Sequence, residues 1–287
     1  MYNRGNEKIK ITVLVDNNTL IDRYFLGEPG VSYLIQDAGR KILFDVGYSD
    51  VFIKNAQKMN IHFWDLDYLV ISHGHLDHTW GLTSLIKYYT EAAIEKIDGT
   101  KPIVIAHPYS FLAKKIKGLK QIGSIISQEE LKKHFKIKLS KEPLWLTERL
   151  VFLGEIERKN DFEAKNPIGK VVKDDFEEDD YLIDDSAMAY RLAKGLVIIT
   201  GCSHSGICNI VEYAKKICRD DRIIDIVGGF HLLNPEKKQL EGTLKYLEKI
   251  KPREVHACHC TDLKSKIALS RVTNLKEVGV GQILEYK

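Results

Sequence analysis

The sequence lacks long apolar runs, a strong excess of one charge and a regular set of cysteines. No apolar run approaches the roughly 18 residues of a membrane-spanning helix, and the N-terminal segment has no long apolar core of the kind that signal peptides carry. With 43 Lys plus Arg against 40 Asp plus Glu, the net charge is only +3, whereas nucleic-acid-binding proteins usually concentrate basic residues on one face. The five cysteines are an odd number without the spacing of a disulfide framework. These absences predict a cytoplasmic protein with reduced thiols and with neither a membrane nor a nucleic-acid partner.

The composition is that of an ordinary globular protein. Apolar residues make up 44% and charged residues 29% of the chain, which excludes a disordered, collagenous or repeat-fibrous protein. At about 150 residues per domain, the length corresponds to one large domain or two small ones, and we expect a single domain over residues 1–287. A chain of this length buries enough apolar surface to need no disulfides.

The N-terminal third alternates short apolar runs with turn residues. Residues 37–40, Asp-Ala-Gly-Arg, separate two of these runs and predict a hairpin turn. The pattern predicts strands at 11–15, 31–36, 41–45, 68–72 and 102–106, and helices at 51–59 and 79–89.

The same regularity returns at residue 186. The pattern there predicts strands at 186–192, 196–200, 223–227, 254–257 and 282–286, and helices at 207–217 and 236–250. In each half antiparallel strands come first and strand–helix units follow. This order predicts an α/β (α+β) fold with two sheets packed face to face between outer helices, a four-layer αββα sandwich.

Residues from about 119 to 181 are rich in Lys and Glu and predict an insertion over the core. The acidic run Asp174–Asp180 predicts a solvated loop. Aromatic residues lie among the charges, which fits either a lid over the functional site or an exposed decoration with its own small core.

The strongest chemical signal is His73-x-His75-x-Asp77-His78, directly after the apolar run 68–72. Residues two apart in an extended loop point the same way, so His73 and His75 can reach one ion. Asp77 and His78 are aimed at a neighbouring position. Imidazole and carboxylate groups suit zinc, iron or manganese.

Four more predicted strands each deliver a histidine at one end. These histidines are His107, His204, His231 and His259. The remaining histidines, at 62, 134 and 256, have no such context, and we expect structural roles for them.

These motifs resemble the metallo-β-lactamase superfamily. The carriers are the HxHxDH loop and the segment KILFDVG at 41–47. Within the superfamily, the segments GHLDHTWGL, TGCSHSGICN, GGFHL and HCTD resemble the subfamily of dihydropterin-methyl-ribofuranosyl-aminobenzene 5′-phosphate synthases. Many members of that subfamily are known only as metal-dependent hydrolases.

The resemblance implies a binuclear metal site. It places His73, His75 and a third histidine on one ion, and Asp77, His78 and a late histidine on the other. His204 fits the third position and His259 the late one.

Several neighbouring residues receive roles from the same resemblance. Cys202 stands where the superfamily has a bridging Asp, either as a thiolate ligand or as a small buried neighbour. Asp45 corresponds to a carboxylate that orients a ligand histidine, although a strand-end turn also explains it. We expect His231 to contact substrate and His107 to line the pocket wall.

The implied activity is hydrolysis of an ester or phosphoester by a metal-activated water, with Asp77 helping to orient the nucleophile. The alternative is the synthase reaction, which joins an aminobenzene ribose phosphate to a pterin with release of pyrophosphate. A di-iron redox protein and a catalytically silent binding protein remain further classes. The expected cofactor is one or two divalent ions, zinc before iron or manganese, and the expected partner is a small molecule, phosphorylated or pterin-like.

Overall fold

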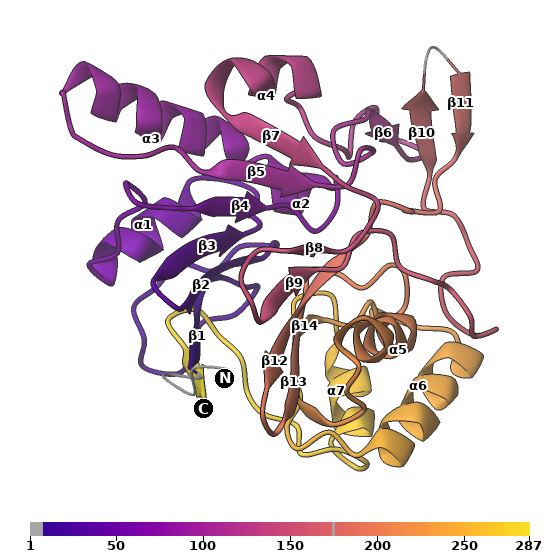
Figure 1. The fold of residues 1–287 in the computed structure, drawn as a ribbon. Coiled ribbons are helices and arrows are strands. Elements are labelled where there is room, and N and C mark those ends of the chain that lie inside the picture. The colour runs from indigo at the N-terminus through magenta and orange to yellow at the C-terminus, as the bar shows by residue number, and fades with distance from the viewer. Residues whose placement is uncertain (1–7, 174–175) are drawn as a thin grey trace.

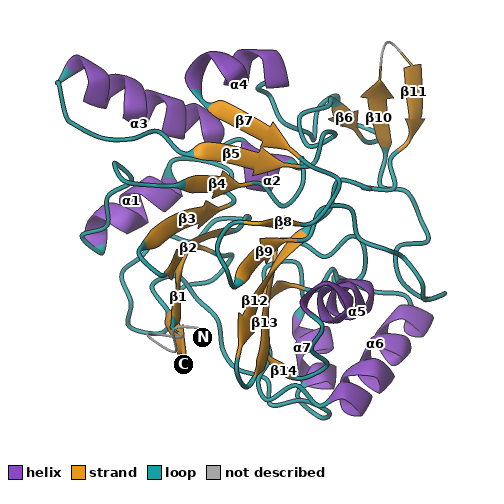
Figure 2. Ribbon diagram, viewed as in Figure 1, coloured by secondary structure: helices purple, strands orange, loops and turns teal. Residues whose placement is uncertain are grey.

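The computed structural model describes residues 8–173 and 176–287, and its two main sheets pack face to face (Figures 1 and 2). The first sheet has the order β16 (Ile283–Tyr286), β1 (Ile9–Val15), β2 (Ser32–Asp37), β3 (Arg40–Phe44), β4 (Tyr68–Val70), β5 (Ile103–Ala106), β7 (Lys136–Leu139). The second has the order β15 (His256–Cys258), β14 (Ile223–Gly229), β13 (Gly195–Thr200), β12 (Ala187–Leu192), β9 (Leu150–Phe152), β8 (Leu144–Trp145).

Helices cover the outer face of each sheet (Figure 1). The first sheet carries α1 (Val51–Lys58), α3 (Leu82–Ile94) and α4 (Gln128–His134), and the second carries α5 (Ile207–Cys218), α6 (Lys237–Ile250) and α7 (Leu263–Leu269). Apolar side chains of both sheets fill the layer between them. The predicted four-layer αββα sandwich is therefore confirmed. In the described residues, none of the helices is both long and apolar enough to cross a membrane.

The predicted turn at 37–40 joins β2 and β3, which pair in register from Asp37 opposite Arg40. Ala38 and Gly39 both have positive φ, 48° and 82°. A two-residue hairpin turn of this kind needs left-handed backbone at both positions, which matches the right-handed twist of the strands.

The predicted insertion over 119–181 is wrong in its extent. β7 is an edge strand of the first sheet, and β8 and β9 belong to the second. β7 resembles a polar segment in the sequence because Lys136 and Lys138 occupy an exposed sheet edge, where they hinder edge-to-edge association.

The added structure is a small third sheet of β11 (Phe176–Asp179), β10 (Lys170–Lys173) and β6 (Lys114–Lys115). The acidic run is thus a strand over 176–179 rather than a loop, although its side chains are exposed as expected. Asp174 and Asp175 lie outside the described residues. Asp180 is buried and ion-paired with Lys114.

The predicted helix at 79–89 is split in the structure. The HxHxDH segment His73–His78, which we call the histidine loop, ends in the short helix α2 (Leu76–Thr79), and α3 begins at Leu82. Gly81 between them has no room for a Cβ, which would lie 2.0 Å from the Val46 carbonyl oxygen. This close approach holds the histidine loop against the strand end that follows β3.

Candidate metal centre

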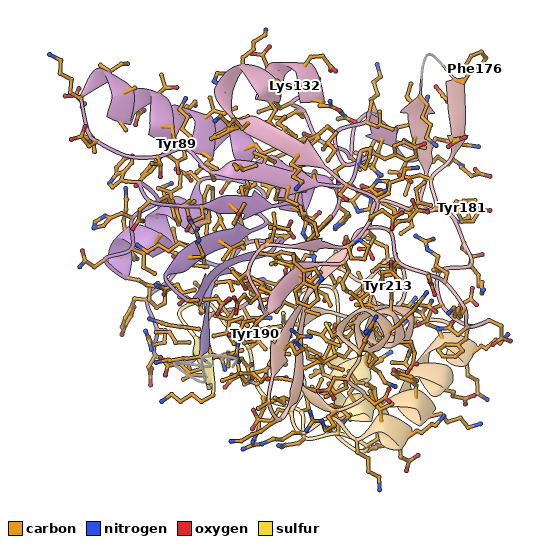
Figure 3. The ribbon with its side chains drawn as sticks, viewed as in Figure 1. Tyr89, Lys132, Phe176, Tyr181, Tyr190 and Tyr213 are labelled. Atoms are coloured by element: carbon orange, nitrogen blue, oxygen red, sulfur yellow. The ribbon has the colours of Figure 1, made fainter. Side chains whose placement is uncertain are left out.

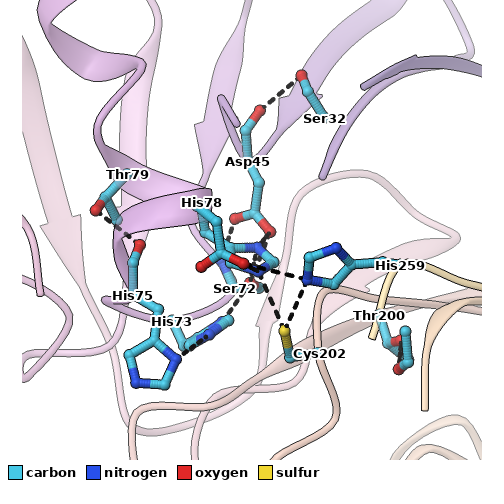
Figure 4. A network of polar contacts seen from close by, with 12 residues as sticks. Ser32, Asp45, Ser72, His73, His75, His78, Thr79, Thr200, Cys202 and His259 are labelled. Carbon is cyan, nitrogen blue, oxygen red and sulfur yellow. Dashed lines mark hydrogen bonds and ion pairs between the residues drawn. The ribbon is translucent and has the colours of Figure 1, made fainter. Parts of the chain in front are cut away.

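Parallel strands bring the predicted histidines to one edge of the sandwich. β3, β4 and β5 run parallel in the first sheet, as do β13, β14 and β15 in the second. Because the carboxyl ends of parallel strands meet at the same edge, the residues that follow them gather there. The histidine loop after β4 faces the loops that carry Cys202 and His259 (Figure 4), and His204 lies beside His73 and His75.

The histidine loop aims its four side chains at two adjacent positions. His75 still has extended backbone, with φ −69° and ψ 156°, and caps the N-terminus of α2. Asp77 and His78 lie within α2 and belong to the second position. The His73 and His78 rings are neighbours, with centroids 4.2 Å apart.

The first group consists of His73, His75 and His204, whose ring nitrogens lie within 4.8 Å of one another. His73 Nε2 is 3.1 Å from His75 Nδ1. Burial and neighbouring positive groups hold the pKa of His73 and of His204 well below the usual range, and lower that of His75 to about 4. The three imidazoles are therefore neutral near pH 7, which leaves lone pairs available to a cation.

Unpartnered nitrogens show that this group fits a metal ion. His75 Nε2 and both ring nitrogens of His204 are buried without a hydrogen-bond partner among the described residues. A buried polar atom without a partner costs about 1–3 kcal/mol. A divalent ion among the three rings would supply the missing interaction.

The second group consists of Asp77, His78, Cys202 and His259. The Asp77 carboxylate lies 3.3 Å from His259 Nε2 and 3.7 Å from His78 Nε2. Burial would raise the pKa of Asp77, but His78 and His259 outweigh it, so the pKa lies below its ordinary value. An ionised carboxylate with two imidazoles and a sulfur is a donor set that suits zinc or iron.

Cys202 lies inside this second group rather than behind it. Its Sγ is 3.2 Å from both His78 Nε2 and His259 Nε2. Burial raises the pKa of the thiol well above its usual value. A nearby cation would reverse that balance, since coordination deprotonates a thiol.

Asp45 orients the His78 ring. Asp45 Oδ2 is 2.7 Å from His78 Nδ1 and accepts a hydrogen bond from the Ser72 hydroxyl at 2.7 Å, while Oδ1 accepts from the Ser72 backbone N–H. The same hydroxyl lies 2.9 Å from His73 Nδ1. One carboxylate and one serine therefore position a histidine of each group, which leaves the Nε2 atoms facing the candidate ions.

Left-handed backbone occurs at several residues of this edge. Four residues other than glycine have left-handed φ here: Asp45 at 56°, Ser203 at 64°, His231 at 51° and His259 at 51°. Such conformations cost about 1–3 kcal/mol each and persist where the surroundings impose them.

Three supporting residues were not identified in the sequence. Asp16, directly after β1, accepts from the His259 backbone N–H at 3.0 Å, and the next residue, Asn17, lies with its Oδ1 2.9 Å from His259 Nδ1. Asp184 accepts from the Gly74 N–H at 2.8 Å and is ion-paired with Lys114. Polar residues directly after an apolar strand are a signal that could have indicated Asp16 and Asn17, whereas nothing local indicates Asp184.

His231 and His107 take different positions. His231 lines a cavity of about 180 Å³ together with His204, and its buried Nδ1 has no hydrogen-bond partner in the part of the chain that the structure describes. His107 is buried beside Glu155, with Nε2 3.3 Å from that carboxylate, and its Nδ1 accepts from the Tyr109 N–H. The structure brings His231 to the site and does not bring His107 into either group of donors.

The cavity beside His204 and His231, which we call the site cavity, is walled by the segment that follows β9. Charged and aromatic side chains both line it: the lysines are Lys165 and Lys238, and the aromatic residues are Phe162 and Tyr181. The cavity can therefore surround a molecule that has both an anionic and an aromatic part.

A third cluster of possible donors, Asp225, Glu254 and His256, lies near the opposite ends of the same strands. Asp225 there accepts a hydrogen bond from Tyr286 of the first sheet at 2.6 Å and lies 2.7 Å from His256 Nδ1. These contacts explain the cluster as a link between the two sheets, in line with the structural role expected for His256.

Comparison with known proteins agrees with this geometry. The uncharacterized protein MJ0448 of Methanocaldococcus jannaschii is 33% identical over 282 residues, which cover 96% of this chain and 99% of that protein. The 7,8-dihydropterin-6-methyl-4-(beta-D-ribofuranosyl)-aminobenzene-5′-phosphate synthase of the same organism is 29% identical over 279 residues, covering 91% of this chain and 90% of the relative.

A solved structure extends the likeness to the whole fold. Tm1679, described as a metal-dependent hydrolase of the beta-lactamase superfamily, has a TM-score of 0.81 and 29% identity, covering 97% of this chain and 99% of that one. Residues 26–215 match the family described as the metallo-beta-lactamase superfamily. Since this match spans more than half of the sequence and includes the histidine loop, the chain belongs to the metallo-beta-lactamase superfamily.

Proposed function

We propose that the protein is a metal-dependent hydrolase that cleaves an ester or phosphoester of a small molecule. The observation that carries this proposal is the pair of adjacent donor groups, one of three neutral imidazoles and one with a carboxylate, which the loop after β4 forms together with the loops after β13 and β15. When bound, divalent ions there supply Lewis acidity and a nucleophilic water near neutral pH.

The residues proposed to hold the ions follow from the two groups. His73, His75 and His204 would hold one ion, and Asp77, His78 and His259 the other. Cys202 would be a further ligand of the second ion. Zinc suits these nitrogen, oxygen and sulfur donors best, before iron or manganese.

The chain itself contributes orientation and substrate contacts. Asp77, on the face toward His259, is proposed to orient the attacking group. His231 is proposed to contact the substrate, because its buried Nδ1 is unpartnered beside the site cavity. Lys165, which lines that cavity, favours a phosphorylated substrate.

A second candidate function is the synthase reaction. The specific observation that favours it is the relative named as a 7,8-dihydropterin-6-methyl-4-(beta-D-ribofuranosyl)-aminobenzene-5′-phosphate synthase, which matches nearly the whole chain. In that reaction the lysines of the site cavity would contact phosphate groups, and the aromatic residues of the cavity would contact an aromatic ring.

All five cysteines are free, which fits the proposed cytoplasmic location.

One experiment separates the two. Purified protein loaded with zinc, manganese or iron is assayed against aryl phosphate esters, aryl carboxylate esters and, separately, a dihydropterin diphosphate with an aminobenzene ribose phosphate. Metal-dependent release of the phenol with loss of activity in His75→Ala supports the hydrolase. Pyrophosphate release that requires both pterin and aminobenzene substrates supports the synthase instead. Metal-independent turnover, or none in any arm, contradicts the proposal.

A further inference from the structure

A groove larger than the site cavity lies between α5, α6 and the segment 157–162. Its volume is about 880 Å³, within the range of small-molecule binding sites. Apolar and aromatic surface is provided by Phe162, Tyr246, Gly242 and Cys208, and we call this cavity the α5–α6 groove. The two helices lie next to each other on the outer face of the second sheet (Figure 1).

The groove adjoins the site cavity. Phe162 and Lys238 line both of them. Phe162 is therefore a shared wall, with His204 and His231 around the space on one side and Tyr246 around the groove on the other.

The segment that carries Phe162 is firmly anchored. Asn160 accepts from the Phe162 and Glu163 N–H groups and donates to the Glu163 carboxylate at 2.6 Å. The buried Glu163 accepts from the N–H groups of Cys208 and Asn209 in the first turn of α5. A carboxylate at a helix N-terminus satisfies free N–H groups and the helix dipole together, so the wall has a defined position.

Gly242 in α6 makes room for the wall. A Cβ at this position would lie 2.5 Å from the nearest carbon of the Phe162 ring. Glycine within a helix costs about 1 kcal/mol relative to alanine. The glycine allows the Phe162 ring to pack closely on the backbone of α6, and this packing offsets the cost.

The rim of the groove is basic. Five lysines and three glutamates line it. Lys216 and Lys159 are paired with Glu157, and Lys238 with Asp161. Lys245 and Lys249 have no ion-pair partner within 4.0 Å in the described part of the chain, and both are on the α6 side of the groove.

We propose that the α5–α6 groove binds the aromatic part of an anionic small molecule whose other end occupies the site cavity. Phe162 and Tyr246 contact the aromatic group, and Lys245 and Lys249 attract a second anionic group at its far end. The proposal rests on the proposed function only for the reaction at the end of the molecule that occupies the site cavity. It narrows the substrate class to elongated aromatic molecules with anionic groups at both ends.

The first test measures binding without activity. The fluorescent anion 1-anilinonaphthalene-8-sulfonate is titrated into the full-length protein. We expect saturable binding with one molecule per chain, weakened about tenfold in the double variant Lys245→Glu/Lys249→Glu and in Tyr246→Ala. The matched controls are Lys87→Glu on α3 and Phe176→Ala on β11, which line neither cavity and should bind the probe as the wild type does. Figure 3 shows Phe176 at the outer end of the hairpin.

Each variant is first checked for a wild-type circular dichroism spectrum and melting temperature. A folded Lys245→Glu/Lys249→Glu variant with wild-type affinity overturns the inference. If Tyr246→Ala does not fold, Tyr246→Leu replaces it, and unchanged affinity in that variant overturns the inference equally.

The second test connects the groove to the site. The kcat/KM of the metal-loaded protein for 4′-carboxybiphenyl-4-yl phosphate is divided by its kcat/KM for phenyl phosphate. We expect this ratio to fall about tenfold in Lys245→Glu/Lys249→Glu and to be unchanged in Lys87→Glu. An unchanged ratio in the double variant overturns the connection. Absence of turnover with both phosphates contradicts the proposed function, and the dye titration then decides the groove alone.

Discussion

At the scale of single residues, Asp45 connects the two donor groups without belonging to either. Its carboxylate holds His78 directly and His73 through Ser72. The left-handed backbone of Asp45 is one that asparagine also tolerates. Asp45→Asn therefore tests the carboxylate charge with little change of backbone.

We expect Asp45→Asn to weaken metal binding by about 10–100-fold, because the orienting partner of a ligand histidine is lost. Competition with a chromophoric chelator measures the affinity. Asp50 has an exposed carboxylate that is ion-paired with Lys54. Asp50→Asn is therefore the control and should bind metal as the wild type does. Equal affinities in Asp45→Asn and Asp50→Asn would show that Asp45 is a turn residue only.

His204 and Cys202 are two positions apart but face different groups. His204→Ala should remove about one equivalent of metal, measured by elemental analysis after gel filtration, since a three-ligand group loses one ligand. Cys202→Ser should retain the ion held by His73, His75 and His204.

A cobalt-substituted sample tests the thiolate. If Cys202 binds the second ion, the near-ultraviolet sulfur-to-cobalt absorption of the wild type disappears in Cys202→Ser and persists in Cys218→Ser, a buried thiol on α5. Persistence of the absorption in Cys202→Ser would place another sulfur on the ion and contradict the proposed ligand set.

At the scale of elements, Lys114 joins the small third sheet to the histidine loop. Its buried ammonium lies 2.9 Å from Asp180 and 2.8 Å from Asp184, and Asp184 accepts from the N–H of Gly74 between His73 and His75. We expect Lys114→Met to lower the free energy of unfolding by about 3–5 kcal/mol, since two buried carboxylates lose their cation. Urea unfolding followed by circular dichroism measures it, and the exposed Lys115→Met should change it by less than about 1 kcal/mol.

The pH dependence of that difference follows from Asp184. Burial would raise the pKa of Asp184, but Lys114 outweighs it and holds the pKa below its ordinary value. A carboxyl whose folded-state pKa is lowered stabilises the fold above its unfolded pKa, near about 4, and loses this contribution as the pH falls through the folded-state value. The gap in unfolding free energy between wild type and Lys114→Met should therefore narrow below about pH 4. A gap that widens on acidification would contradict this account.

At the scale of the whole molecule, two buried tyrosine–aspartate pairs tie the sheets together in opposite directions. Tyr190 of the second sheet donates to Asp37 of the first at 2.8 Å, and Tyr286 of the first donates to Asp225 of the second at 2.6 Å. Both contacts cross the apolar layer and join residues 153 and 61 positions apart in the chain.

Tyr286→Phe should lower the free energy of unfolding by about 1–3 kcal/mol, because the buried Asp225 loses a donor. Metal content should not change, since Tyr286 lies away from the donor groups. Thermal unfolding and elemental analysis measure the two quantities, with the half-exposed Tyr48→Phe as the control. A loss of metal in Tyr286→Phe would show that the two ends of the sandwich are coupled.

Local spacing made much of this protein predictable. His73, His75, Asp77 and His78 were identified because a loop after an apolar strand presents them together whatever surrounds it. Hydrophobic periodicity predicted the strands β12, β13 and β14 and the helices α5 and α6, with boundaries that differ from the structure by at most two residues. The edge strand β7 was missed because its exposed lysines resemble a loop in the sequence, and β8 was missed because its two residues are too few to show a pattern.

The sequence by itself determined the residue types of the donor groups and the strand ends that deliver them, because both depend on neighbours within a few positions. Only the tertiary structure decided which distant residues contact one another around these groups. Cys202 meets His78 across 124 positions and His259 across 57, and Lys114 meets Asp184 across 70. Contacts over such separations depend on how two sheets, packed through an apolar layer, align their strand ends, and no local pattern carries that alignment.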